Sequence, residues 1–146
     1  MDRRALVQRL ARAITAAHVA LYRARGGRLL NRFRNGPVLL LTTQGRKTGR
    51  SRTTPLLYIR DGDDYVVVAS NGGMDWEPAW WLNLRANPVA QVEAGSRPDQ
   101  VRAERVDPAE QARLWPRLTR MYPGYDDYQR RVSREIAVVR LRPVPR

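Results

Sequence analysis

The order of apolar and polar residues divides the chain into a helical N-terminal segment and a strand-rich remainder. In residues 2–25, apolar side chains recur every three to four positions, as on one face of a helix, and arginines occupy the other faces. Gly26-Gly27 is predicted to end this helix. After residue 36, short apolar runs are separated by glycine, proline and aspartate, which is typical of strands and turns.

Six of these runs are predicted to form strands. They are Val38–Thr43, Thr53–Arg60, Tyr65–Ser70, Pro88–Glu93, Gln100–Arg105 and Ile136–Leu141. Most of their connections are short enough for hairpins, and Asp61-Gly62 is a strong hairpin signal. We therefore expect an α+β fold, mainly β, in which an antiparallel sheet closes or half closes into a barrel with helices outside it.

Three further helices are predicted between these strands. Pro78 is expected to be the first residue of a short helix that ends at about Ala86. Asp107-Pro108 supplies the cap and the first residue of a second helix, which ends near Tyr122. A short helical piece follows from about Tyr125.

The net charge of +13 is concentrated at the start of the chain. Residues 1–36 hold nine arginines and one acid, residues 37–60 hold five basic residues and no acid, and residues 61–146 hold thirteen of each kind. The first 60 residues are therefore expected to attract phosphates, acidic lipids or another anionic ligand.

The composition excludes several kinds of chemistry. The chain has no cysteine, which rules out thiol catalysis and disulfides and is in keeping with a reducing, cytoplasmic compartment. Its one histidine, His18, cannot form a multi-histidine metal site, and no metal site is predicted. No apolar run reaches the roughly 18–20 residues of a membrane span, and no signal peptide is recognised.

The segment Gln44–Arg52 has the composition of an anion-binding loop, with two glycines, four cations and two hydroxyl side chains. Glycine lets backbone N–H groups turn toward an anion, arginine supplies a planar fork of donors and lysine supplies a point charge. The spacing is not that of a nucleotide P-loop, and the segment joins two predicted strands. From these residues alone, a solvated basic hairpin is an equally good interpretation.

Aromatic residues near two turns are candidates for the walls of a ligand pocket. Ser70–Gly73 ends a strand in a turn that can lie close to a flat ligand, and Trp80-Trp81 follows on the next helix. The two tryptophans are expected to face different ways, so that one lines a pocket, with packing as the alternative. Tyr122, Tyr125 and Tyr128 recur every three residues, and their hydroxyls are able to polarise a carbonyl or nitro oxygen unless they too only pack.

Several motifs together resemble those of the deazaflavin-dependent nitroreductase family. They follow one another in order, with similar spacing, over about residues 37–141. The matching segments are Gly45–Gly49 with Arg52 and Pro55-Leu56, Ala69-Ser70 with Gly72-Gly73, Pro78–Leu84, Ala86–Pro88 and Met121–Gln129. Residues 1–36 match only in character, as a basic helical arm.

This resemblance implies a split β-barrel in residues 37–146, preceded by an amphipathic arm in residues 1–36, and the use of coenzyme F420, a deazaflavin with a phosphate and a glutamate tail. The residues implied to bind the cofactor are Arg46, Lys47, Thr48, Gly49, Arg52, Pro55, Val68, Ala69, Ser70 and Asn83. Those implied to act on the acceptor side are Ser70, Trp80, Tyr122, Tyr125 and Tyr128. The implied reaction is hydride transfer from reduced F420 to a quinone or, in some members, to a nitro compound.

Other functions stay open at this point. Split barrels also bind flavin mononucleotide or haem, although the lone His18 lies in the arm. The basic composition suggests nucleic-acid binding, but no nucleic-acid-binding motif is recognisable and the basic excess ends after Arg60, so we expect no nucleic-acid partner. Residues 1–30 are suited to peripheral contact with an anionic membrane, or to packing on the barrel or a second subunit, so monomer and homodimer are both open.

Overall fold

The structure is a computed structural model that describes residues 2–10, 32–33, 36–95 and 97–145. Residues 3–10 are helical, in agreement with the start of the predicted N-terminal helix. The rest of that predicted helix, with His18 and Gly26-Gly27, lies outside the described residues.

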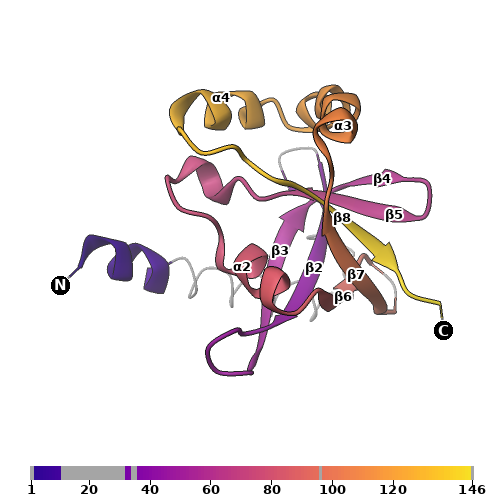
Figure 1. The fold of residues 1–146 in the computed structure, drawn as a ribbon, viewed down its shortest axis with the longest axis horizontal. Helices are drawn as coiled ribbons and strands as arrows, with labels where there is room; N and C mark the ends of the chain where they lie inside the picture. The colour runs from indigo at the N-terminus through magenta and orange to yellow at the C-terminus, as the bar shows by residue number, and fades with distance from the viewer. Residues whose placement is uncertain (1, 11–31, 34–35, 96, 146) are drawn as a thin grey trace.

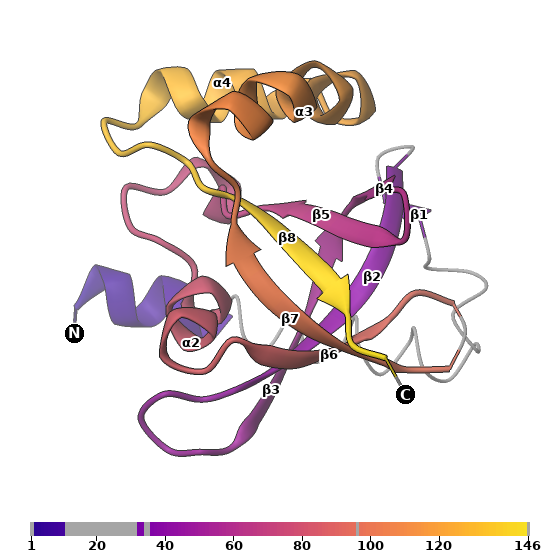
Figure 2. The ribbon, with the colours of Figure 1, turned by 45° about the vertical axis from the view of Figure 1, so that its right-hand side comes forward.

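The described strands form one antiparallel sheet that curls into a split barrel (Figure 1, Figure 2). They are β1 (Arg32–Phe33), β2 (Gly36–Gln44), β3 (Ser51–Leu57), β4 (Ile59–Asp61), β5 (Asp64–Val68), β6 (Val89–Glu93), β7 (Asp99–Arg105) and β8 (Val138–Pro143). Their order is β1-β2-β6-β7-β8-β5-β4, and β3 pairs with β2. Antiparallel pairing joins β2 to β3, β4 to β5 and β6 to β7, as the short connections predict.

The strands differ from the predicted ones in number and in their ends. The predicted strand Thr53–Arg60 is two strands, because the backbone leaves its pairing with β2 after Leu57 and pairs with β5 from Ile59. Ser70 has helical backbone angles, so the third predicted strand ends at Val68. With β1 added, the described residues contain eight strands where six are predicted.

Three helices flank the sheet: α2 (Ala79–Ala86), α3 (Pro108–Met121) and α4 (Gly124–Arg131). The predicted cap of α3 is confirmed, since Asp107 accepts a hydrogen bond from the N–H of Glu110 at 2.8 Å. Pro78 precedes α2 instead of beginning it, because its backbone is extended, at φ −68° and ψ 147°. Helices α3 and α4 lie together over one end of the barrel, and α2 lies on the side of residues 3–10 (Figure 2).

The central strands are buried on both faces, which explains their continuous apolar sequences. Along β5, Tyr65 and Val67 belong to a core cluster that includes residues of α2, whereas Val66 and Val68 belong to a second cluster with residues of α3 and α4. Strand β8 divides its side chains in the same alternating way. The sheet is therefore the middle layer between two cores.

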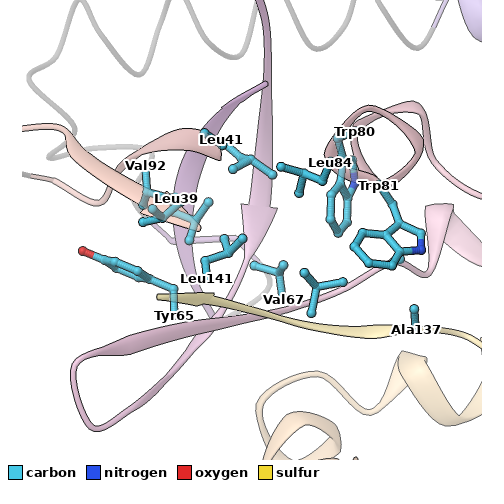
Figure 3. Close-up of a cluster of buried hydrophobic side chains, with 14 residues drawn as sticks. Leu39, Leu41, Tyr65, Val67, Trp80, Trp81, Leu84, Val92, Ala137 and Leu141 are labelled. Atoms are coloured by element: carbon cyan, nitrogen blue, oxygen red, sulfur yellow. The ribbon is translucent and has the colours of Figure 1, made fainter. Parts of the chain in front are cut away.

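Trp80 and Trp81 lie in the same core cluster, the first of the two (Figure 3). Each is 5% exposed, and their ring centroids are 6.4 Å apart. Packing, the alternative considered for these residues, describes both rings, because two adjacent indole rings can fill one cluster from different directions on the helix. A role of Trp80 on the acceptor side stays a prediction.

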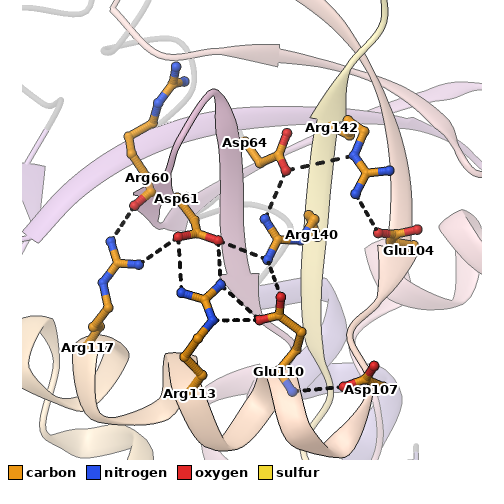
Figure 4. Close-up of polar contacts among 10 residues, drawn as sticks. All are labelled: Arg60, Asp61, Asp64, Glu104, Asp107, Glu110, Arg113, Arg117, Arg140 and Arg142. Atoms are coloured by element: carbon orange, nitrogen blue, oxygen red, sulfur yellow. Dashed lines mark hydrogen bonds and ion pairs between the residues drawn. The ribbon is translucent and has the colours of Figure 1, made fainter.

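A network of charged side chains joins the β4–β5 hairpin to α3 and β8 (Figure 4). Arg140 of β8 is 7% exposed and donates to Asp61 at 3.0 Å and to Asp64 at 2.9 Å. Asp61 also accepts from Arg113 at 2.7 Å and from Arg117 at 2.9 Å. Hydrogen bonds from Arg113 and the other two arginines hold the pKa of Asp61 well below its usual value, against the effect of partial burial. The side chain of Arg140 points into the protein because of its position on β8, and the network supplies hydrogen-bond partners for its buried guanidinium.

Asp61→Asn is expected to lower the free energy of unfolding at pH 7 by about 1–2 kcal/mol, because a neutral amide pairs less well with three arginines. Folding lowers the pKa of Asp61, so its contribution is complete above the unfolded-state pKa of roughly 4 and is lost as the pH falls below it. The difference between wild type and variant should therefore shrink from about pH 5 to pH 2.

Urea unfolding at several pH values measures this difference. Asp63→Asn, at an exposed position of the same hairpin turn, is the matched control and should change stability little. A difference between wild type and Asp61→Asn that stays constant over this pH range would contradict the prediction.

Candidate functional site

The predicted anion-binding loop is a hairpin between β2 and β3 with hydrogen bonds inside it. The N–H of Gly45 donates to the carbonyl of Arg50, and the N–H of Gly49 donates to the carbonyl of Gly45, both at 2.8 Å. The hydroxyl of Thr48 accepts from the N–H of Arg50 at 3.2 Å. Gly49 has φ +73°, which favours glycine. The loop therefore has a defined shape of its own.

Asn83 of α2 anchors this loop to the rest of the protein. Its side-chain oxygen accepts from both the backbone N–H and the guanidinium of Arg46, each at 3.1 Å. Its amide donates to the hydroxyl of Thr43 at 3.1 Å, and both Asn83 and Thr43 are buried. Two predicted cofactor-binding residues, Arg46 and Asn83, are thus in direct contact. Thr43 was not predicted, since a threonine in a strand gives no signal of its own.

Four cations project from the anchored loop. Arg46, Lys47, Arg50 and Arg52 are exposed, and the ion pairs among the described residues involve none of them. Like charges held this close repel one another, and a bound anion relieves the repulsion. Their guanidinium and ammonium groups are donors that can bind a phosphate or a carboxylate, and anion binding by this loop stays a prediction.

A second group of predicted site residues lies where the turn after β5 meets α4. The turn contains a short 3-10 helix, η1 (Asn71–Gly73), and begins at Ser70, which is 8% exposed. Gly73 has φ +79°, and a Cβ there would lie 2.8 Å from the ring of Tyr128. Because only glycine allows this approach, the turn and Tyr128 are held side by side.

The three predicted tyrosines form one cluster but differ in burial. The hydroxyls of Tyr122 and Tyr128 are hydrogen-bonded at 2.7 Å, and both residues are half-buried. Tyr125 is 4% exposed and packs edge-on against Tyr122, with ring centroids 4.9 Å apart. Burial, reinforced by the two neighbouring tyrosines, raises the pKa of Tyr125. The structure therefore pairs two of the hydroxyls, while Tyr125 supports them from the core.

Gly124 sets the position of Tyr122. A Cβ at Gly124 would lie 2.7 Å from the Tyr122 ring and 2.9 Å from its hydroxyl oxygen. The ring therefore rests directly on the backbone at the start of α4.

The other predicted residues lie in or beside the core. Val68, Ala69 and Trp80 are buried, and Pro55 of β3 is half-buried. The indole N–H of Trp81 is buried and has no hydrogen-bond partner among the described residues, which costs about 1–3 kcal/mol. Helix α2 carries Trp80 and Asn83 and lies between the anion-binding loop and α4 (Figure 1, Figure 2). The predicted residues thus lie in two groups, one around the β2–β3 loop and Asn83 and one where the turn after β5 meets α4.

An open depression of about 720 Å³ lies elsewhere, beside the charged network of Asp61 and Arg140. None of the predicted site residues lines it. Its charged groups are largely paired with one another, so it is not the candidate site. The described residues also hold no group of histidine, aspartate or glutamate side chains that could bind a metal ion.

Comparison with known proteins shows the family to which the chain belongs. A family profile described as F420H(2)-dependent quinone reductase matches residues 14–143. The chain belongs to the F420H(2)-dependent quinone reductase family. An F420H(2)-dependent quinone reductase of Mycobacterium tuberculosis is 44% identical over 126 residues, which are 84% of this chain and 85% of that protein. The resemblance inferred from the sequence motifs is confirmed, and the description of the family names a quinone as the acceptor.

Solved structures of similar fold include an enzyme that is described by the same cofactor. An F420-H2 dependent reductase has a TM-score of 0.67 and is 33% identical, covering 72% of this chain and 93% of its own. A protein described as a domain-swapped dimer has a TM-score of 0.67 and is 29% identical, covering 84% and 98%. The haem storage protein of Vibrio cholerae, 14% identical with a TM-score of 0.58 over 75% and 82%, shares the fold alone. The split-barrel prediction is confirmed.

Proposed function

We propose that this protein transfers a hydride from reduced coenzyme F420 to a quinone, with nitro compounds as a secondary class of acceptor. The observation that carries the proposal is the loop of four exposed cations anchored by Asn83. A phosphate and a chain of carboxylates are the ligands that such a set binds best. The M. tuberculosis relative and the solved reductase are both described as F420H2-dependent, which supports the choice of cofactor.

The anchored loop would hold the phosphate and tail through Arg46, Lys47, Thr48 and Arg52, with Gly49 shaping the turn. The residues that would border the ring are Pro55, Val68, Ala69, Ser70 and Asn83. When bound, reduced F420 supplies the hydride. The protein's own part is to hold ring and acceptor at near contact, roughly 3–3.5 Å. Asn83 serves this task twice, because its buried side chain also fixes the loop.

On the acceptor side, Ser70, Trp80, Tyr122, Tyr125 and Tyr128 would form the wall. The hydroxyl that accepts the bond between Tyr122 and Tyr128 becomes a stronger donor in turn. A donor of this kind stabilises the negative charge that develops on a quinone oxygen as it is reduced. Tyr125 contributes by packing beneath Tyr122.

Lys47→Ala is expected to weaken the affinity for oxidised F420 by roughly tenfold at low salt and to flatten its salt dependence, because one charge-assisted contact is lost. Fluorescence titration at low and moderate salt measures both effects. Arg97→Ala, an equal charge change at an exposed position between β6 and β7, is the control.

The same titration with flavin mononucleotide, haem and duplex DNA tests the alternative functions. Tight binding of flavin mononucleotide without binding of F420 would overturn the proposal. An unchanged dissociation constant for Lys47→Ala would remove the loop from the cofactor site.

Tyr122→Phe is expected to lower the turnover number with a soluble quinone by about tenfold or more while changing the affinity for F420 little, since it removes a donor to the developing oxyanion. Steady-state kinetics and cofactor titration provide the two measurements. Tyr58→Phe, at a half-buried position packed against the first core cluster, controls for the loss of a tyrosine hydroxyl. Equal turnover in Tyr122→Phe and wild type would exclude this hydroxyl from the chemistry.

We also propose that residues 1–30 bring the protein, from the cytoplasm, to the inner face of the cell membrane. In the described helix 3–10, Leu6 and Leu10 are 41% and 56% exposed among exposed arginines. Arg4 lies 5.0 Å over the ring of Trp76, so the helix adjoins the turn that follows Ser70. Anionic lipid attracts the arginines and the apolar side chains insert, which suits a lipid quinone as acceptor.

No helix among the described residues is long and apolar enough to cross a membrane. The protein is expected to be a monomer or a homodimer, and the domain-swapped dimer of a neighbour 29% identical favours the homodimer.

Deletion of residues 1–30 is expected to weaken binding to vesicles of anionic lipid by about tenfold or more, because several arginines near the surface contribute about 1 kcal/mol each. Co-sedimentation with vesicles measures the binding, and zwitterionic vesicles serve as the control. Unchanged binding to anionic vesicles would refute the membrane proposal and leave the arm as a packing element.

A further inference from the structure

Arg134 spans the turn that carries Ser70. It lies between α4 and β8, and its guanidinium donates to the carbonyls of Ala69 at 3.1 Å and Ser70 at 3.0 Å. The same group donates to the carbonyl of Met74 at 3.1 and 3.2 Å. One planar side chain therefore binds both ends of the turn, across 60 to 65 positions of sequence.

The turn needs support from outside itself. Three consecutive residues, Asn71, Gly72 and Gly73, have positive φ angles of 50°, 63° and 79°. Asparagine adopts this conformation only at a cost in free energy, and two glycines lose much conformational freedom when they are ordered. Only two backbone hydrogen bonds are found within the turn, from Gly73 to Ser70 at 2.9 Å and from Met74 to Asn71 at 3.2 Å.

The main chain of Arg134 is in turn fixed by α4. The side chain of Gln129 donates to the carbonyl of Arg134 at 2.9 Å and accepts from the N–H of Ile136 at 3.0 Å. Helix α4 also carries Tyr128, whose ring lies against Gly73. Gln129 and Arg134 therefore connect the helix of the tyrosines to the turn of Ser70 by a continuous set of hydrogen bonds.

We propose that Arg134 is a positioning residue that fixes Ser70 relative to the Tyr122–Tyr128 hydroxyl pair, so that all three face one acceptor. This inference rests on the proposed function, because it assumes that these hydroxyls act on the acceptor. Arg134 itself does not touch the acceptor. A misplacement of about 1 Å in such a set lowers turnover by up to about a hundredfold.

The test compares Arg134→Gln and Arg134→Lys with wild type in full-length protein. Arg130→Gln is the matched control, since Arg130 is an exposed arginine of α4 that pairs with Asp127 within the helix. Hydrogen exchange of peptides covering residues 69–76 measures opening of the turn. Titration with oxidised F420 and steady-state reduction of a soluble naphthoquinone give the dissociation constant, kcat and KM.

We expect Arg134→Gln to speed exchange in residues 71–74 and to lower kcat by roughly tenfold or more. The dissociation constant for F420 should change less than kcat, because the β2–β3 loop is left intact although Ala69 and Ser70 border the ring. Arg134→Lys keeps the charge and some donors, so it should recover part of kcat. Faster exchange in the turn with an unchanged kcat would show that Arg134 only stabilises the turn, and would overturn the inference. Unchanged exchange in the turn would overturn it as well.

Failure of the proposed function gives a different result, because wild-type protein would then neither bind F420 nor reduce the quinone. Should Arg134→Gln fail to fold, Arg134→Lys carries the test alone. A lysine variant that folds, exchanges faster in residues 71–74 and keeps the wild-type kcat would equally overturn the inference.

Discussion

Burial of β5 and β8 on both faces is the constraint on which the rest of the molecule depends. Because side chains alternate along a strand, the apolar sequences of β5 and β8 supply one core toward α2 and another toward α3 and α4. The first core holds α2, whose Asn83 anchors the β2–β3 loop, and the second holds α4, which carries Tyr125 and Tyr128. The same alternation buries Arg140, and the carboxylates of Asp61 and Asp64 make that burial tolerable.

The sequence predicted the elements well where local signals were strong. Asp107-Pro108 capped α3 as expected, and the Asp61-Gly62 hairpin formed. The prediction was wrong where contacts between distant segments set the ends of a strand. The predicted strand Thr53–Arg60 is divided, because its two halves pair with different strands. Pro78 could not be placed within one position, since its fixed φ suits both the residue before a helix and its first residue.

The candidate site was predictable only in part, and for similar reasons. Charge, glycine and ordered motifs identified the loop and the tyrosines, because these signals are local in sequence. The difference between the buried Tyr125 and the half-buried Tyr122 depends on packing against the second core, which periodicity does not report. The hydrogen bonds of Arg134 reach residues 60 to 65 positions away, so nothing near it in the sequence distinguishes it from the other arginines.

Gly124 has a consequence for the geometry of the tyrosine cluster. Gly124 has no side chain, and the Tyr122 ring lies on its backbone, within 3 Å of the position that a Cβ would take. An added methyl group would displace that ring and with it the hydrogen bond between the Tyr122 and Tyr128 hydroxyls. The absence of a side chain at this one position, at the start of α4, is therefore a condition for the geometry of the paired hydroxyls.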